Sequence, residues 1–220
     1  MREYLNITNE CNIELMKRYD DNHFDLAIVD PPYGIGQNKN NGKSIGLRKK
    51  WSGYDKKKYT PKNWDNKPPT EDYFKELFRV SKNQIIWGAN YFNLKPTKGI
   101  IAWDKQCDGT GFSHFELAWS SFDKSANIFR YPIQGESQNR IHPTQKPVQL
   151  YKWLLTKYAQ DGFKIIDTHL GSGSIAIALD SVNKYEKMNL TLTACELDKE
   201  HYKNAINRID VETRQESLFA

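Results

Sequence analysis

The sequence contains few cysteines, and no two of them lie close together in the chain. Three cysteines occur among 220 residues, Cys11, Cys107 and Cys195, and they are widely spaced. They form no Cys-x-x-Cys pair and have no histidine nearby at the spacing of metal ligands. A disulfide framework and a zinc site are therefore not expected, and the sequence predicts no bound metal.

Long apolar runs are also lacking. No stretch approaches the roughly 20 apolar residues that a membrane-spanning helix needs, and the first four residues lack the basic-then-apolar pattern of a secretory signal. Hydrophobic residues make up 38% of the chain and charged residues 27%, which lies on the polar side of globular proteins. We expect a cytoplasmic protein without a membrane partner, folded as a single domain over residues 1–220.

Excess basic charge is confined to one segment. The formal net charge is +5, but residues 37–65 alone hold nine basic and two acidic residues, an excess of +7, so the rest of the chain carries −2. Such a concentrated patch is typical of a site for a polyanion. The alternative is a solvated loop whose lysines only keep the protein in solution.

Short apolar runs alternate with helical patterns along the chain. The stretch from Gly34 to Pro69 is rich in Gly, Asn, Lys and Pro and predicts a long loop. Strands are expected at 24–29, 84–87, 100–103, 115–119, 164–167 and 190–196. Helices are expected at 70–78, 147–159, from 172 onward and at 198–209. The alternation predicts an α/β fold, a parallel sheet with helices on both faces.

A glycine-containing turn follows one of these strands and precedes a helix. In the segment from Asp167 to Ser174, Gly171 and Gly173 allow backbone amides to approach a ligand closely. Glu196 ends the next strand, where an acid can accept both hydroxyl protons of a ribose. Together they predict a nucleoside-containing cofactor. The alternatives are a turn that only lets helix and strand pack, and an ordinary surface glutamate.

Asp30-Pro31-Pro32-Tyr33 directly follows the strand expected at 24–29. The prolines stiffen the backbone, so that a carboxylate and a carbonyl point in one direction. Both can accept the two hydrogens of an exocyclic amine, which raises lone-pair density on its nitrogen for attack on a sulfonium methyl group. Tyr33 adds an aromatic face on which an extruded base can stack. The alternative is a proline-rich turn without function.

Three motifs in one order carry a resemblance to a known family. The segment Asp30 to Tyr33 comes first, His142-Pro143-Thr144-Gln145-Lys146-Pro147 second, and the glycine turn with Glu196 last. The chain resembles, over nearly its whole length, the β-class (permuted) DNA amino-methyltransferases of the N6-adenine type. The resemblance implies a doubly wound, mostly parallel seven-stranded sheet in permuted order, a Rossmann-like fold, S-adenosyl-L-methionine as methyl donor, and base flipping before transfer.

The resemblance also implies residue roles. Asp30 and the carbonyl of Pro31, stiffened by Pro32, bind the target amine, and Tyr33 stacks on the base. The residues implied to bind the cofactor are Cys11, Asp30, Thr144, Gln145, Lys146, Asp167, His169, Gly171, Ser172, Gly173, Glu196 and Leu197. One departure stands out, because the family commonly has Pro-Phe where this chain has Thr168-His169. An aromatic wall against the cofactor is then lost.

DNA recognition is expected in the basic segment. The family's usual recognition region is reduced here to about residues 122–140, so the loop at about 37–65 is the better candidate. Aromatic residues lie between its charges. The side chains expected to contact DNA are Lys39, Lys43, Arg48, Lys49, Lys50, Lys56, Lys57 and Lys58.

Several alternatives remain open. Cytosine C5 methylation is set aside, because it needs a cysteine nucleophile that usually follows proline, and the cysteines here follow Glu10, Gln106 and Ala194. Cytosine N4 methylation uses the same acceptors and stays open. A non-catalytic DNA-binding relative of the same fold is a further alternative. By resemblance we expect a bacterial, phage or mobile-element origin, a partner restriction endonuclease or none, and a homodimer as one possible assembly. The recognised DNA sequence cannot be inferred.

Overall fold

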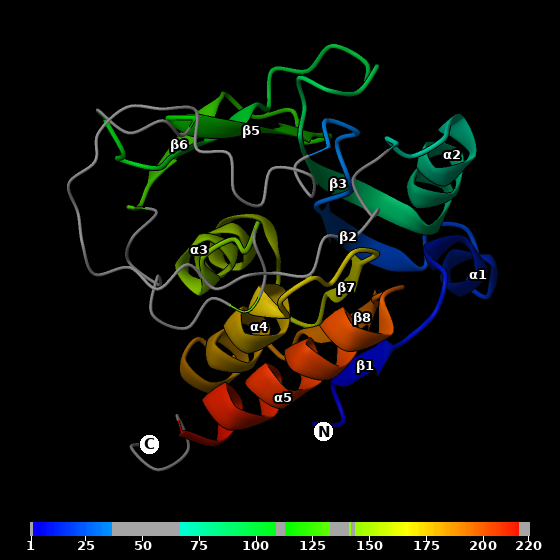
Figure 1. The fold of residues 1–220 in the computed structure, drawn as a ribbon, viewed down its shortest axis with the longest axis vertical. Coiled ribbons are helices and arrows are strands. Elements are labelled where there is room, and N and C mark those ends of the chain that lie inside the picture. The colour runs from blue at the N-terminus through cyan, green and yellow to red at the C-terminus, as the bar shows by residue number, and fades with distance from the viewer. Residues whose placement is uncertain (1, 37–66, 109–112, 133–140, 142–143, 216–220) are drawn as a thin grey trace.

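The computed structural model describes residues 2–36, 67–108, 113–132, 141 and 144–215 (Figure 1). The basic segment 37–65 therefore lies outside the described residues, as do His142 and Pro143.

The described residues form one eight-stranded sheet in the order β1-β8-β7-β2-β3-β5-β4-β6. Five neighbouring pairs are parallel, and β5 is antiparallel to both β3 and β4. The strands are β1 (Leu5–Thr8), β2 (Phe24–Val29), β3 (Ser81–Trp87), β4 (Ile101–Asp104), β5 (Phe115–Ser120), β6 (Asn127–Arg130), β7 (Lys164–Asp167) and β8 (Thr191–Cys195). The mostly parallel α/β sheet is confirmed, but the expected seven strands are corrected to eight.

The two strands that sequence patterns did not predict are β1 and β6. They are the two edges of the sheet, and each has only four residues. Each of these strands pairs with a neighbour on one side only. Four residues also contain too few alternating positions for a strand to be recognised from a sequence. The permuted order of the strands stays a prediction.

Among the described residues, five helices cover both faces of the sheet: α1 (Asn12–Lys17), α2 (Glu71–Val80), α3 (Val148–Tyr158), α4 (Ser174–Tyr185) and α5 (Lys199–Gln215). Figure 1 shows α1 and α2 on one side and α3, α4 and α5 on the other. Neighbouring residues of β2 face opposite layers: Val29 packs with Leu77 of α2, whereas Ile28 belongs to the core that contains Leu154 of α3. Because both faces are covered, β2 is almost wholly buried.

The carboxyl ends of β1, β8, β7, β2 and β3 meet at one edge, since these five strands are parallel neighbours. The chain leaves β7 through α4 toward β8, and it leaves β2 toward β3 with α2 in between. The β7–β2 boundary is therefore the point where the winding reverses. Ligands of open α/β sheets bind outside the carboxyl ends of the strands at such a point.

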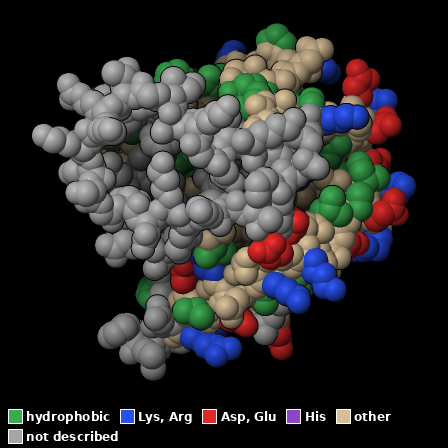
Figure 2. Space-filling view, in the orientation of Figure 1, with side chains coloured by type: hydrophobic (Ala, Val, Ile, Leu, Met, Phe, Trp, Pro, Cys, Tyr) green, Lys and Arg blue, Asp and Glu red, His purple; other side chains and the backbone are tan. Residues whose placement is uncertain are grey.

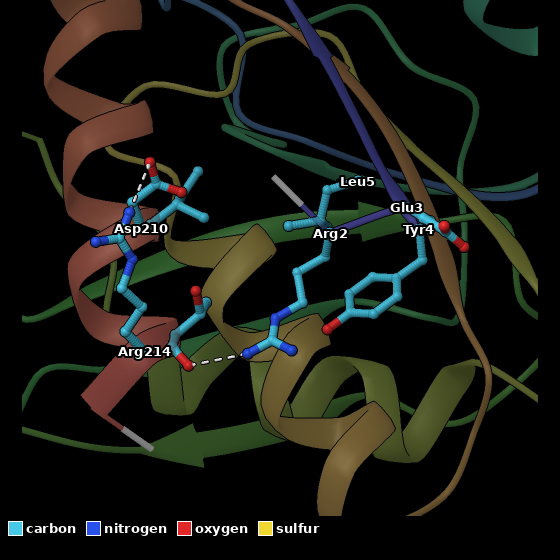
Figure 3. A pocket seen from close by; sticks show the side chains of 8 residues that line it. Arg2, Glu3, Tyr4, Leu5, Asp210 and Arg214 are labelled. Atoms are coloured by element: carbon cyan, nitrogen blue, oxygen red, sulfur yellow. Dashed lines mark hydrogen bonds and ion pairs between the residues drawn. The ribbon is translucent and has the colours of Figure 1, made fainter. Parts of the chain in front are cut away.

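A separate hollow of about 500 Å³ lies between the first described residues and α5 (Figure 3). Three of the charged residues that line it, Arg2, Asp210 and Arg214, are engaged in ion pairs. The Arg2 guanidinium contacts the buried Asp180 carboxylate at 2.9 Å and donates to the Thr213 carbonyl at 3.2 Å, while Lys184 contacts Asp180 at 2.9 Å. These bonds fasten the start of the chain to α4 and α5, so we assign this hollow a structural role.

The described surface bears both signs of charge. Figure 2 shows Lys and Arg side chains next to Asp and Glu over the helices of this face. Within the described residues, no helix has the length and apolar character to cross a membrane.

Candidate active site

A cavity of about 340 Å³ opens at the carboxyl edge of the sheet, within the size range of small-molecule sites. Its wall is formed by residues that follow β1, β2, β7 and β8, together with the segments 67–70 and 144–146. The predicted site residues in this wall are Cys11, Asp30, Pro32, Thr144, Gln145, Lys146, His169, Gly171, Ser172, Glu196 and Leu197. Segments far apart in sequence thus meet around one space.

Four predicted site residues lie behind or beside the wall. Tyr33 is joined to Asp30, because its hydroxyl donates to Asp30 Oδ1 at 2.7 Å. Asp167 is buried and accepts the main-chain N–H of His169 at 2.9 Å. Pro31 is buried, and Gly173 begins α4.

The glycine turn holds the carboxylate of Glu196. Gly171 has a φ of +55°, and its N–H donates to Glu196 Oε2 at 3.0 Å, while the N–H of Asp198 donates to Oε1 at 2.9 Å. Gly173, with a φ of +76°, packs so closely on α5 that a Cβ would lie 2.8 Å from Ile209 Cδ1. The carboxylate is therefore fixed at the cavity wall by two backbone donors.

A side chain of α5 supports the same turn from behind. The Arg208 guanidinium donates to the Ser172 carbonyl at 3.1 Å and to Ser174 Oγ at 2.9 Å. Ser174 Oγ in turn donates to the Lys146 carbonyl at 2.8 Å. The turn and the segment 144–146 are thus held together as one wall.

Asp167 is a carboxyl group whose charge is poorly compensated. Only 2% of the residue is exposed. Burial raises its pKa to about 7; the N–H of His169 opposes the shift, and the charges of Asp30 and Glu196 add to it. A cationic group brought close to Asp167 would favour the ionised form and so bind more tightly.

His169 is neutral and fixed by neighbours that sequence reasoning missed. Burial lowers its pKa to about 3. Its Nε2 lies 3.0 Å from the amide nitrogen of Asn12, and its Nδ1 lies 2.9 Å from Thr168 Oγ1. Because the Asn12 nitrogen is a donor, we assign the ring proton to Nδ1. The Thr168 hydroxyl continues to the Tyr73 hydroxyl at 2.7 Å.

The wall contains an aromatic ring despite the Thr168-His169 departure. Tyr73 of α2 lines the cavity and meets the His169 ring edge-on at 5.3 Å and 67°. Helical spacing alone makes Tyr73 a core position, so nothing in the sequence distinguished it. The other unpredicted wall residues are Glu10, Asn12, Ile13, Lys67, Pro68, Pro69, Thr70, Tyr151, Thr168, Leu170 and His201.

Asp30 is held from two sides. Besides the Tyr33 hydroxyl on Oδ1, the Lys146 ammonium group contacts Oδ2 and donates to the Tyr33 hydroxyl at 3.3 Å. Only 3% of the Lys146 side chain is exposed, against 19% of Asp30. Burial raises the pKa of Asp30, although the Lys146 charge opposes this.

Lys146 also contacts an acid for which the sequence suggested no role. Its Nζ lies 3.1 Å from Glu116 Oε2 of β5, and Glu116 Oε1 lies 2.5 Å from Lys105 Nζ. Asp30, Lys146, Glu116 and Lys105 therefore form a row of alternating charge. Burial acts to raise the pKa of Glu116, but Lys146 and Lys105 lower it to about 2.

The ring of Tyr33 is seated by the turn after β3, which the sequence did not reveal either. Gly88 has a φ of +82°, and a Cβ there would lie 2.4 Å from Tyr33 Cε1. Tyr91 stacks on Tyr33 with ring centroids 4.8 Å apart and an interplanar angle of 16°. Because Tyr91 is 44% exposed, it presents a second aromatic surface beside Tyr33.

Comparison with known proteins bears on the fold. No family model matches the chain. A curated relative, YubD of Escherichia coli (strain K12), named as a candidate methylase, is 23% identical over 209 residues, with 81% of each chain covered.

Three solved structures are similar over nearly the whole chain. The M1.HpyAVI–SAM complex has a TM-score of 0.59 at 15% identity, covering 94% of this chain and 99% of that one. The cytosine-N4-specific PvuII DNA methyltransferase has a TM-score of 0.55 at 8% identity, covering 96% and 94%. TTHA0409 of Thermus thermophilus, a candidate DNA modification methylase complexed with S-adenosyl-L-methionine, has a TM-score of 0.52 at 13% identity, covering 94% of each. The chain has a methyltransferase fold.

In this methyltransferase fold, the residues expected to contact DNA lie outside the described part of the chain, because all of them fall within residues 37–66. The reduced recognition region at 122–140 is described up to residue 132 and contains the edge strand β6. Both assignments stay predictions.

Proposed function

We propose that this protein transfers a methyl group from S-adenosyl-L-methionine to the N6 amino group of adenine in DNA, after the base is flipped out of the helix. One observation carries the proposal: a single cavity at the switch point joins the Asp30 carboxylate after β2 to the glycine turn after β7 and to Glu196 after β8. The methyltransferase fold supports S-adenosylmethionine-dependent DNA methylation in general, and the choice of adenine rests on the Asp-Pro-Pro-Tyr motif.

The wall of the cavity fits this cofactor. Both Glu196 and Leu197 line the cavity. Glu196 would accept the ribose hydroxyls, and Leu197, which is 72% exposed, would offer an apolar surface for the adenine ring. Asp167, whose burial raises its pKa, suits a cationic ligand. The buried Gln145 Nε2 has no hydrogen-bond partner among the described residues, so a donor is available for a ligand acceptor. When bound, the cofactor supplies a methyl group activated by a sulfonium charge.

Asp30 and its neighbours prepare the attacking nitrogen. Asp30 and the carbonyl of Pro31 accept the two amine hydrogens, which weakens conjugation of the nitrogen with the ring and directs its lone pair to the methyl group. As the nitrogen gains the methyl group it must lose one proton. A buried carboxylate with a raised pKa accepts that proton more readily than an ordinary aspartate would.

DNA would be held by the basic segment 37–65, through contacts of its lysines and Arg48 with phosphates. Tyr33 and the exposed Tyr91 would provide stacking surfaces for the flipped base or its neighbour. The permuted order of catalytic and cofactor strands, cytoplasmic location, a homodimer and a partner endonuclease remain parts of the same prediction.

The test is methylation of DNA by the purified protein. Unmethylated plasmid is incubated with labelled S-adenosyl-L-methionine and wild type or Asp30→Asn, and the product is digested to nucleosides. N6-methyladenine formed by wild type only is the expected result. N4-methylcytosine would favour the alternative that the PvuII enzyme represents. Absence of label on DNAs of varied sequence, with DNA binding retained, would favour a non-catalytic relative.

A further inference from the structure

We propose that Glu116 is a positioning residue for the methyl transfer: it is a second acceptor for the Lys146 ammonium group, and it retains Lys146 when the target amine competes for Asp30. This inference rests on the proposed function. It concerns a residue on β5, an antiparallel strand on the far side of β3 from the glycine turn.

The geometry shows one cation shared between two carboxylates. Lys146 Nζ contacts Asp30 Oδ2 and lies 3.1 Å from Glu116 Oε2. The ammonium group also lies 5.2 Å from the centre of the Trp87 ring. Since only 3% of the Lys146 side chain is exposed, water cannot replace either carboxylate easily, and a buried cation that loses one partner must keep another.

Because Lys146 is shared with Glu116, the Asp30 carboxylate stays available to accept a hydrogen of the target amine. With a single partner, the Lys146 charge would be neutralised by Asp30 alone, and the carboxylate would be a weaker acceptor for the amine. With Glu116 present, Lys146 can shift its contacts toward Glu116 as the amine arrives. Glu116 is itself held by Lys105 at 2.5 Å, and Lys105 lies 5.3 Å from the centre of the Trp103 ring. Lys105 therefore limits how strongly Glu116 attracts Lys146.

The groups that can influence Asp30 come from several elements. Those with an electrostatic or hydrogen-bond influence are Lys146, Glu116, Tyr33, Tyr73, Tyr151 and Asp167. Burial raises the pKa of all three tyrosines, so they stay neutral at ordinary pH. Asp167 titrates near neutrality, but it is unchanged in the variants below, so a difference between variants reports on Asp30.

The experiment compares Glu116→Gln with Lys105→Met, two substitutions on the same side of the row with opposite expected effects. Glu116→Gln removes the second acceptor, so kcat should fall about tenfold, with the KM for S-adenosyl-L-methionine changing less than threefold. The acid limb of the kcat profile should move to lower pH by about half a unit or more. Lys105→Met should move the acid limb to higher pH, because Glu116 then draws Lys146 away from Asp30.

A second measurement needs no substrate. The Asp30 carboxyl is followed by ¹³C NMR titration, with its signal assigned from Asp30→Asn. Its pKa should fall in Glu116→Gln and rise in Lys105→Met. A merely structural role would lower the stability of both variants and leave the carboxyl titration unchanged. Shifts of opposite sign support the inference, and equal or absent shifts overturn it. Because the titration is read without DNA, failure of wild type to methylate DNA would overturn the proposed function separately.

Discussion

The candidate site has a proposed cofactor half around Glu196 and a proposed catalytic half around Asp30, and the two hold their carboxylates in different ways. In the cofactor half, Glu196 is held by the backbone N–H groups of Gly171 and Asp198. In the catalytic half, Asp30 is held by the side chains of Tyr33 and Lys146, and Lys146 is shared with Glu116. The first half is thus made mainly by main-chain geometry, and the second by charged and aromatic side chains.

This difference has consequences for substitution. Backbone donors persist whatever side chain is changed, so a cofactor-half substitution should remove one contact and leave the rest of the turn in place. In the catalytic half each charge stabilises the next. The effects of two substitutions there should therefore not add when they are combined in a double variant.

Asp30→Asn should lower kcat about 10³-fold, because the neutral amide oxygen accepts the amine hydrogen more weakly than a carboxylate and does not take up the proton. The protein should stay folded, since Lys146 keeps Glu116 as a partner. Single-turnover methylation and a thermal unfolding scan measure the two effects. Activity above a tenth of wild type would contradict the assigned role.

Gly88→Ala should lower kcat about 100-fold, because a Cβ 2.4 Å from Tyr33 Cε1 displaces the ring beside Asp30. Gly162→Ala is the matched control. Gly162 has a φ of +76°, close to the +82° of Gly88, but an added Cβ there meets nothing within 4 Å. The control should share the backbone strain, about 1 kcal/mol of stability, and keep wild-type kcat. Equal kcat values for the two variants would argue against the seating of Tyr33.

Glu196→Gln should weaken S-adenosyl-L-methionine binding about 30-fold, corresponding to about 2 kcal/mol for hydrogen bonds to a charged acceptor. At saturating cofactor, kcat should change little. Glu10→Gln is the control, since Glu10 lines the same cavity but is engaged by Arg18 at 2.7 Å and by the Thr8 hydroxyl at 2.5 Å. Calorimetric titration measures both, and similar affinities for the two variants would refute the ribose assignment.

The affinity for S-adenosyl-L-methionine should rise about tenfold from pH 6 to pH 8. Burial raises the pKa of Asp167 to about 7, so its ionised fraction grows from about one tenth to about nine tenths over this range. Only the ionised form attracts a cationic ligand, so affinity increases with pH and levels off above the pKa. Binding measured across this range in wild type and Asp167→Asn tests the sign. If the affinity of Asp167→Asn rose with pH as steeply as that of wild type, Asp167 would be excluded as the source of the pH dependence.

Much of the cofactor half could be predicted from the sequence because its signals are local. Gly171 and Gly173 stand in one short turn between a strand and a helix, and Glu196 directly follows the next strand along the chain. The turn's geometry therefore follows from neighbouring residues. Asp30 could be predicted as a site residue for the same reason, because two prolines follow it directly at the end of β2.

The sequence by itself thus determined the alternation of strands and helices, the glycine turn and the position of Asp30, because each depends on residues close together in the chain. Only the tertiary structure decided that Lys146 lies between Asp30 and Glu116, that Tyr73 lines the cavity and that Gly88 packs against Tyr33. These contacts join segments tens of residues apart. They exist only once the sheet order brings β2, β3, β5 and β7 together, and no local pattern specifies that order.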